Sequence, residues 1–390
     1  MLPRELLNND PGGFAWGVWH DRTPQLIARV RDENPFGPVQ RRALDELQEE
    51  IASGVMQPLG PDTHDRETWS GWGAGYFGKP WLEAPFLWSE SYFYRRLLEA
   101  TGFFGPGPWR WVDPFEHLKA AELEDPGLEG DLAALEDLER LPAAEQGTAR
   151  LLASLWGNRA DLGFRMGQSP EAREQGSARL IADDSADLWA ALGPGASVVV
   201  VTDNAGREVL ADLVLIDHLL RHDLASTVSL HVKPWPYYVS DATAADVAAC
   251  LRRLARAPGS AGAVARRVGA AMAEGRIGLD SHEFYCAPWS YRHMPSGLAS
   301  QFQHAALTIL KGDLNYRRLV EDRAWPAVTP LTDVASYFPG SFAALRTLKS
   351  DVVTGLCPAT VAELDATGQP WRTDGRHALL QVLRRAERPG

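Results

Sequence analysis

Two carboxylates and one carboxamide lie where a parallel sheet would carry ligand-binding groups. Asp203 and Asn204 directly follow the valine run 198–201, and Asp241 follows the next apolar run, 228–232. Open parallel sheets bind ligands at the carboxyl ends of their strands. Carboxylate and amide oxygens with no histidine or thiolate nearby suit a hard dication such as Mg²⁺ or Mn²⁺. These three side chains are therefore predicted to bind a divalent metal ion.

Two cations in later segments complete a set of groups suited to phosphoryl chemistry. Arg317 lies in the segment 311–319 (KGDLNYRRL), and Lys349 lies in the segment 345–351 (LRTLKSD). Arg346 and Lys349 are three residues apart and would share one face of a helix. Lysine and arginine neutralise the phosphate oxygens that a dication leaves uncovered. The combination predicts an enzyme that acts on a phosphate ester.

Each of these positions also has a purely structural interpretation. Asp and Asn are frequent helix caps, so Asp203, Asn204 and Asp241 could each cap the helix that follows. The segment 311–319 could be an ordinary surface connection, because Gly, Asp and Asn are common turn residues. The hypothesis of a metal site therefore depends on whether the side chains converge in space.

Residues 176–390 are predicted to form the α/β domain that brings these groups together. Short apolar runs alternate with helical patterns there, which is typical of a mostly parallel, doubly wound sheet in a three-layer α/β/α sandwich. The predicted strands are 198–201, 228–232, 283–286, 307–310 and 351–354, and the predicted helices are 207–222, 243–255, 261–274 and 298–306.

Residues 1–175 are predicted to form a helical, aromatic-rich subdomain that precedes the α/β domain. Segments 38–53 and 89–100 are amphipathic helices. The tryptophan-rich stretch 68–88 either packs as an irregular loop or walls a pocket. The acidic segment 122–145 is interpreted as a solvated helical insertion with no role in the chemistry.

The segment 155–162 (LWGNRADL) places polar residues among apolar ones directly after a helical pattern. Such residues usually cap or bridge neighbouring elements. Asn158 and Asp161 are nevertheless candidates for a position in the pocket.

The overall composition limits the classes of partner. A net charge of -12 argues against nucleic acid and anionic membranes, because both require a basic surface. The cysteines Cys250, Cys286 and Cys357 are too few and too widely spaced for a disulfide framework or a zinc site, and we expect buried thiols. No signal peptide or long apolar span is apparent, so we expect a cytoplasmic protein that binds a small molecule. The oligomeric state is left open.

Eight short motifs, in order along the chain, support a family resemblance. They are SYFYRRL (91–97), DPF (113–115), LWGNRADL (155–162), DNAG (203–206), VSDAT (239–243), HEFYCAP (282–288), KGDLNYRRL (311–319) and RTLK (346–349). This set resembles the metal-dependent damage-control phosphatases, once named domain of unknown function eighty-nine, in the branch described as acidic-residue methyltransferases. GDLNYR and RTLK are specific motifs, and the resemblance covers nearly the whole chain.

The resemblance implies a role for each motif residue. Asp203, Asn204 and Asp241 would bind the metal, which is Mn²⁺ or Mg²⁺, with Ni²⁺ and Co²⁺ as further candidates. Asp203, Asn204 and Lys349 would be catalytic. The substrate would contact Glu208, Asp241, Asp313, Leu314, Asn315, Tyr316, Arg317 and Lys349, and we add Asn158 and Arg346 to this group.

The resulting prediction is a metal-dependent phosphatase that hydrolyses fructose 1-phosphate or fructose 6-phosphate. Its nucleophile is either metal-bound water or Asp203 through an aspartyl phosphate. One alternative is an S-adenosylmethionine-dependent carboxyl (glutamate) methyltransferase. Gly193 and Gly195 argue against it, because they precede the first strand of the motif instead of following it. Another alternative is a phosphatase of specialised metabolism that acts on a nucleoside or modified-sugar phosphate.

Overall fold

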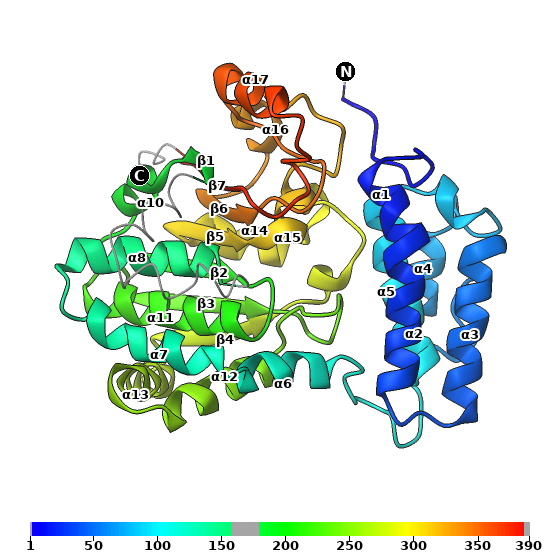
Figure 1. Cartoon of the computed structure of the whole chain (residues 1–390), viewed down its shortest axis with the longest axis horizontal. Helices are drawn as coiled ribbons and strands as arrows, with labels where there is room; N and C mark the ends of the chain where they lie inside the picture. The colour runs from blue at the N-terminus through cyan, green and yellow to red at the C-terminus, as the bar shows by residue number, and fades with distance from the viewer. Residues whose placement is uncertain (1, 158–178, 386–390) are drawn as a thin grey trace.

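A mostly parallel sheet lies at the centre of the molecule (Figure 1). The computed structural model describes residues 2–157 and 179–385. In these residues the sheet has seven strands in the order β1-β7-β6-β5-β2-β3-β4, and every neighbouring pair is parallel except β6 with β7. The strands are β1 (Leu180–Asp183), β2 (Ser197–Val201), β3 (Thr227–Val232), β4 (Ile277–Ser281), β5 (Leu307–Lys311), β6 (Phe342–Thr347) and β7 (Ala378–Leu383).

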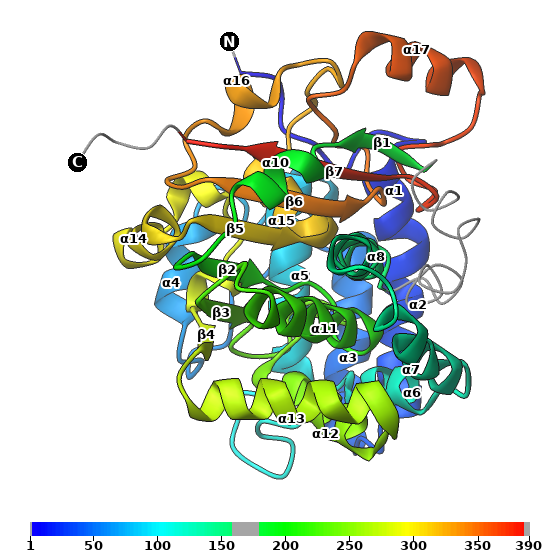
Figure 2. The same cartoon turned by 90° about the vertical axis from the view of Figure 1, so that its left-hand side faces the viewer.

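Helices cover both faces of this sheet (Figure 2), which confirms the predicted three-layer α/β/α sandwich. The first face is covered by α7 (Gly127–Leu138), α8 (Ala143–Leu155), α11 (Arg207–Arg221), α12 (Ala244–Arg256) and α13 (Gly259–Ala273). The second face carries α14 (Ser296–His304), α15 (Gly312–Leu319) and α16 (Leu331–Ala335), and the layer ends with α17 (Pro358–Ala366). The short α10 (Ser185–Ala190) packs beside β7.

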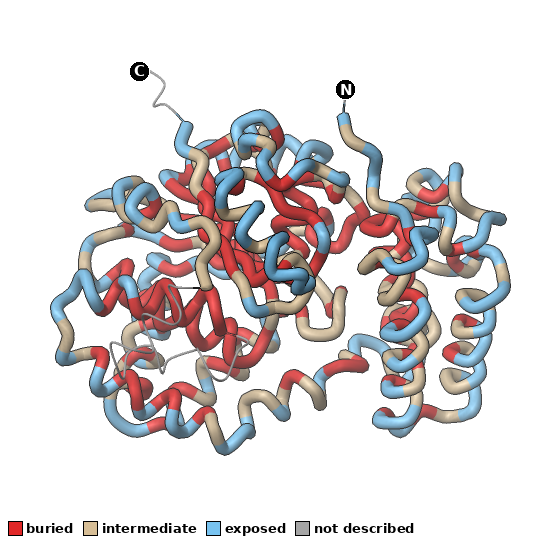
Figure 3. Tube along the Cα trace, turned by 45° about the horizontal axis from the view of Figure 1, so that its top comes forward, coloured by how far each residue is buried: buried red, intermediate tan, exposed pale blue. Residues whose placement is uncertain are grey.

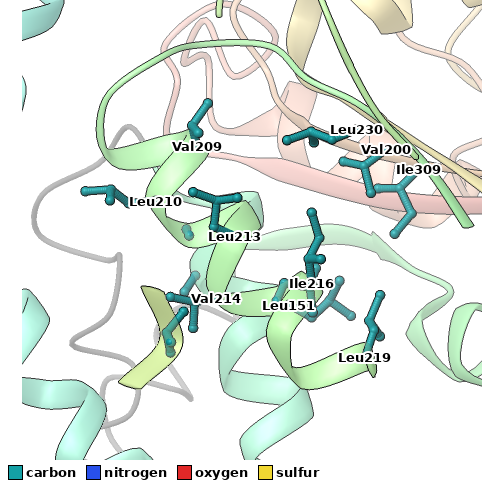
Figure 4. Packing of buried hydrophobic residues seen from close by; sticks show 14 of the residues in the cluster. Leu151, Val200, Val209, Leu210, Leu213, Val214, Ile216, Leu219, Leu230 and Ile309 are labelled. Atoms are coloured by element: carbon teal, nitrogen blue, oxygen red, sulfur yellow. The ribbon is translucent and has the colours of Figure 1, made fainter. Parts of the chain in front are cut away.

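Four apolar residues on α11, spaced 4, 3 and 4 positions apart, determine how this helix packs: Val209, Leu213, Ile216 and Leu220. Val209, Leu213 and Ile216 are each buried to within 1% exposure and join one cluster with residues of the central strands (Figure 4). Burial of side chains of this size contributes about 1.5–3 kcal/mol each. Figure 3 shows the consequence, with buried strands at the centre and exposed outer faces on the helices.

The N-terminal helices form a separate cluster beside the carboxyl ends of the central strands (Figure 1). They are α1 (Phe14–Gly17), the π-helix η1 (Val18–Arg22), α2 (Thr23–Glu33), α3 (Pro38–Ser53), α4 (Arg66–Trp72), the 3₁₀ helix η2 (Trp81–Glu83) and α5 (Phe86–Thr101). The next helix, α6 (Glu116–Glu124), packs against α7 and α12 of the sheet domain. The division of the chain at residue 175 stays a prediction, and α7 and α8, which precede it, pack against α13 and α11 of the sheet domain.

Three predicted strands are confirmed and two are wrong. Residues 198–201, 228–232 and 307–310 lie within β2, β3 and β5. Residues 283–286 instead form the 3₁₀ helix η4 (Glu283–Cys286), and a second 3₁₀ helix, η5 (Tyr291–His293), follows it. Residues 351–354 form no strand, because the chain enters the sheet earlier, at β6. Arg346 therefore lies on β6 and Lys349 lies beyond its end, so the predicted shared helix face is also wrong.

Two smaller expectations can be compared with the structure. Cys250 and Cys286 are buried as expected, but Cys357 is exposed. Within the described residues, no helix has the length and apolar character needed to cross a bilayer. Asn158 and Asp161 lie outside the described residues.

Candidate active site

The polar turn after β2 lies directly against the turn that follows β3. The Ala205 amide donates to the Ser240 carbonyl (2.6 Å), and the Ala242 amide donates to the Asp203 carbonyl (2.9 Å). An isolated antiparallel bridge also pairs Asn204 with Asp241. Backbone hydrogen bonds therefore bring the two segments together, although many residues separate them along the chain.

Neither Asp203 nor Asp241 caps a helix. Helix α11 begins after Gly206, and the N-cap of α12 is Thr243, which forms a capping box with Asp246. Asp203 and Asp241 are buried and line the same cavity. The capping interpretation of both residues is therefore wrong.

Gly312 allows the third strand end to approach Asp203. Its φ of +82° is left-handed, and a Cβ atom at this position would lie 1.9 Å from the Asp203 Oδ2. Any side chain here would displace the carboxylate, so only glycine fits.

A cavity of about 380 Å³ lies between the sheet domain and the N-terminal helices. The sheet domain contributes Asp203, Asn204, Tyr238, Val239, Ser240, Asp241, Asp313, Leu314, Arg317 and Lys349. The helices contribute Phe14, Val18, Trp19, Arg22, Thr23, Leu26, Glu90, Phe93 and Tyr94. Among the described lining residues none comes from 68–88, whose Trp69, Trp81 and Trp88 pack within the helical cluster. That stretch, which includes parts of α4, η2 and α5, packs within the helical cluster and does not wall this cavity.

Burial and mutual repulsion disfavour two ionised aspartates in this cavity. Burial raises the pKa of Asp203 well above its usual value, and the charges of Glu208 and Asp241 raise it further. Burial also raises the pKa of Asp241, against the opposing effect of Lys233, whose Nζ lies 3.9 Å from Asp241 Oδ2. A bound cation would relieve both effects.

The donor set fits a hard dication. In the described part of the chain, no three His, Cys, Asp or Glu side chains are grouped for metal binding, so an ion held by Asp203 and Asp241 would need the Asn204 amide oxygen as a third ligand. That amide now donates to Asp203 Oδ2 (2.8 Å) and Glu208 Oε2 (3.0 Å), while its oxygen accepts from the Ser240 hydroxyl. The Asn204 oxygen has a second lone pair with which it could bind an ion.

A buried lysine that the sequence analysis gave no role lies behind the site. The Lys311 Nζ donates to the Ser154 carbonyl (2.7 Å), Asp212 Oδ1 (2.6 Å) and Glu208 Oε1 (3.3 Å). These bonds fix Glu208, which in turn accepts from Asn204. In the sequence, the feature that could have indicated this role is a lysine at the end of the apolar run 307–310.

Four of the residues predicted to contact substrate line the cavity together with Asp241: Asp313, Leu314, Arg317 and Lys349. Burial would raise the pKa of Asp313, but Arg346 and Arg317 lower it below its usual value. Asp313 Oδ1 accepts from the Ser350 hydroxyl (3.1 Å) and the Lys349 amide (3.4 Å). Asp313 therefore anchors the loop that carries Lys349.

Among the described residues, the other predicted contacts do not line the cavity. Asn315 is fully buried and accepts from the Tyr291 hydroxyl (2.7 Å), and the Tyr316 hydroxyl donates to Gln381 Oε1 (3.0 Å). Arg346 is fully buried and donates to Asp313 Oδ1. These residues, like Glu208, lie behind the groups that face the cavity.

The acidic segment 122–145 is not a solvated insertion remote from the motifs, which corrects the prediction. A Cβ atom on Gly206 would lie 2.1 Å from the Glu122 Oε2, so this segment touches the DNAG turn. Arg207 donates to Asp125 Oδ1 (2.8 Å) and to the buried Asp131. The segment therefore fixes the start of α11, where composition alone indicated only a solvated helix.

Comparison with protein families shows where the chain belongs. The sequence profile of the damage-control phosphatase ARMT1-like domain matches residues 18–364. The chain belongs to this family. It is therefore an enzyme of the phosphatase class, as the motifs predicted.

Curated relatives of this phosphatase family align along nearly their whole length. Damage-control phosphatase ARMT1 of Mus musculus is 29% identical, with 97% of this chain and 98% of the relative covered. The Homo sapiens protein of the same name is 27% identical, with 98% of each chain covered. The crystal structure of a DUF89 family protein from Pyrococcus horikoshii aligns with a TM-score of 0.50 and 18% identity over 90% of this chain and 94% of that one, which supports the fold.

Proposed function

We propose that this phosphatase uses a divalent metal ion to hydrolyse a small sugar phosphate of the fructose 1-phosphate or fructose 6-phosphate type. The observation that carries the proposal is that Asp203, Asn204, Asp241 and Lys349 line one cavity. Three oxygen donors suit Mn²⁺ or Mg²⁺, and the ammonium group supplies positive charge to a phosphate.

In the proposed reaction, one group of residues holds the ion and another binds the phosphate. Asp203, Asn204 and Asp241 would hold the ion, which when bound polarises the phosphate. Lys349 neutralises charge on the equatorial phosphate oxygens, and Asp313 positions the Lys349 loop through the bonds described above.

Aromatic side chains are suited to hold the sugar. The rings of Tyr94 and Tyr238 stack with centroids 4.4 Å apart, and both residues line the cavity. The Tyr238 hydroxyl donates to Glu90 Oε2 (3.0 Å), which fixes this pair across the two parts of the molecule. An apolar ring face with polar groups at its rim suits a polyol.

Release of inorganic phosphate tests the proposal. Purified protein is incubated with fructose 1-phosphate, fructose 6-phosphate and nucleoside monophosphates, each with Mn²⁺, Mg²⁺, Ni²⁺ or Co²⁺. We expect metal-dependent release that is fastest from a fructose phosphate, and no methyl transfer from labelled S-adenosylmethionine. A preference for a nucleoside phosphate would overturn the substrate, and metal-independent release would overturn the role of the ion.

The nucleophile is decided by a separate experiment. Single-turnover hydrolysis in ¹⁸O water labels Asp203 only if an aspartyl phosphate forms and water then attacks its carbonyl carbon. Attack of water at phosphorus puts the label into phosphate, as direct hydrolysis of the substrate also does. Trapping with hydroxylamine therefore accompanies it, because hydroxylamine captures an acyl phosphate directly. A trapped adduct at Asp203 supports covalent catalysis, and its absence with normal turnover supports direct attack by water.

A further inference from the structure

The charged side chains of the cavity divide into paired and unpaired groups. Arg317 Nη1 lies 2.7 Å from Glu90 Oε2, and its other nitrogens contact Asp322. Arg346 Nη2 lies 2.7 Å from Asp313 Oδ1. The lining charges Arg317, Glu90 and Asp313 therefore already have partners, so they offer little to a ligand.

Three lining charges form no ion pair within 4.0 Å among the described residues: Asp203, Lys349 and Arg22. The proposed function uses Asp203 for the metal ion and Lys349 for the phosphate. Arg22 is the cation that this chemistry does not use.

Arg22 is also on the opposite wall from Lys349. It is the last residue of η1, in the N-terminal helices, whereas Lys349 follows β6 in the sheet domain. Its guanidinium carbon lies 5.3 Å from the centroid of the Phe14 ring, which limits where the exposed side chain can point. A cavity of about 380 Å³ separates the two walls and has room for a small organic phosphate.

We propose that Arg22 forms a second anion subsite, which binds a carboxylate or phosphate at the end of the substrate remote from the phosphate that is hydrolysed. This inference rests on the proposed function and extends it to sugar phosphates that carry a second anionic group. An arginine suits the task because its planar fork binds carboxylates and phosphates through two hydrogen bonds.

Matched substrates test the subsite. Initial rates are measured for fructose 1,6-bisphosphate against fructose 6-phosphate, and for 6-phosphogluconate against glucose 6-phosphate, with the wild type and Arg22→Gln. We expect Arg22→Gln to lower kcat/KM about tenfold for the member with two anionic groups that uses the subsite, mainly through KM, and less than about twofold for its single-phosphate partner. The bisphosphate pair reports on a phosphate and the gluconate pair on a carboxylate.

Two further variants separate charge from geometry and position. Arg22→Lys should recover part of the loss, because it keeps the charge and loses the fork. Arg29→Gln is the matched control, since Arg29 lies on α2, is exposed, pairs with Glu33 (3.0 Å) and does not line the cavity. It should match the wild type with every substrate.

Equal losses for both members of each pair would show that Arg22 binds the hydrolysed phosphate and would overturn the subsite, as would no loss for any substrate. Calorimetric titration of the same sugars separates this outcome from failure of the proposed function. If the wild type hydrolyses none of them, weaker binding to Arg22→Gln of only a sugar with two anionic groups still supports the subsite, and unchanged binding rejects it.

Discussion

Asp241 owes its proposed role as a metal ligand to the contact between two turns that are far apart in the sequence. In sequence it resembles a helix cap, but Thr243 caps α12 and Asp241 lines the cavity with Asp203. We expect Asp241→Asn to lower the rate of phosphate release at least about a hundredfold, because an amide replaces a charged ligand of the ion. Activity assays and calorimetric Mn²⁺ titration measure the two effects.

The control for this variant is Asp137→Asn, an exposed substitution on α7 that should leave both measurements unchanged. Circular dichroism should show that Asp241→Asn is folded. Wild-type turnover by the folded variant would remove Asp241 from the site.

Gly312 offers a second test at the level of single residues. Gly312→Ala and Gly368→Ala both put a side chain at positive φ, which costs about 1–2 kcal/mol in each case. Only the first also forces a Cβ atom against Asp203, because nothing lies within 4 Å of a Cβ at Gly368. We expect phosphate release to be largely lost in Gly312→Ala and retained in Gly368→Ala, and we expect the lower melting temperature for Gly312→Ala because of the added clash. Equal activity of the two variants would contradict the close approach to Asp203.

Helix α7 is attached to the start of α11 through Arg207, and the two aspartates that bind this arginine differ in burial. The side chain of Asp131 is 3% exposed, whereas that of Asp125 is 51% exposed. Removing one partner of a buried ion pair costs about 3–5 kcal/mol, and an exposed pair is worth at most about 1 kcal/mol. Urea unfolding should therefore show a large loss of stability for Asp131→Asn and a small one for Asp125→Asn. Equal effects would mean that α7 does not depend on the buried pair.

His231 on β3 should make stability depend on pH. Burial lowers its pKa from 6.5 in the unfolded chain to about 4, and Nδ1 contacts the Tyr285 hydroxyl. Between these values the unfolded chain takes up the proton and the folded protein does not, so protonation favours unfolding. Stability should fall as the pH drops from 6.5 towards 4, by up to about 1.4 kcal/mol per pH unit from this residue.

The test of this pH effect compares the wild type with His231→Gln in urea unfolding at pH 7, 6, 5 and 4.5. Other groups contribute to both proteins, so the difference in slope isolates His231. A slope that is unchanged by the substitution would contradict the shift.

At the level of elements, the sequence predicted central strands better than flanking ones. β2 is buried on both faces, and its run of β-branched valines is typical of such a strand. β4 lies at the sheet edge with Gly278 and Leu279 exposed, and β6 contains an Ala-Ala-Leu run that is equally compatible with a helix. Pairing with β5 and β7 makes β6 a strand, and this long-range effect is not visible locally.

For the whole molecule, the sequence predicted the groups at strand ends and missed those on the opposite wall. Asp203 and Asp241 follow apolar runs, so general rules about parallel sheets identify them. Arg22 and Glu90 face them only because the N-terminal helices pack over this edge, and nothing in their own segments indicates a ligand. Tertiary packing also decides that Asn315 is structural although its neighbour Leu314 lines the cavity.

A dication that binds only where the two turns meet should stabilise the whole molecule. Asp203, Asn204 and Asp241 converge through contacts that exist only in the folded chain, so the unfolded chain lacks the site. Mn²⁺ at a hundred times its dissociation constant should then add about 2.7 kcal/mol to the free energy of unfolding.

Treatment with EDTA should abolish phosphate release and lower the melting temperature, and excess Mn²⁺ should restore both. Asp241→Asn should melt at the same temperature with or without Mn²⁺, because it lacks a ligand. If EDTA leaves both phosphate release and the melting temperature unchanged, the ion takes no part. If Mn²⁺ raises the melting temperature of the variant as much as that of the wild type, the ion binds elsewhere.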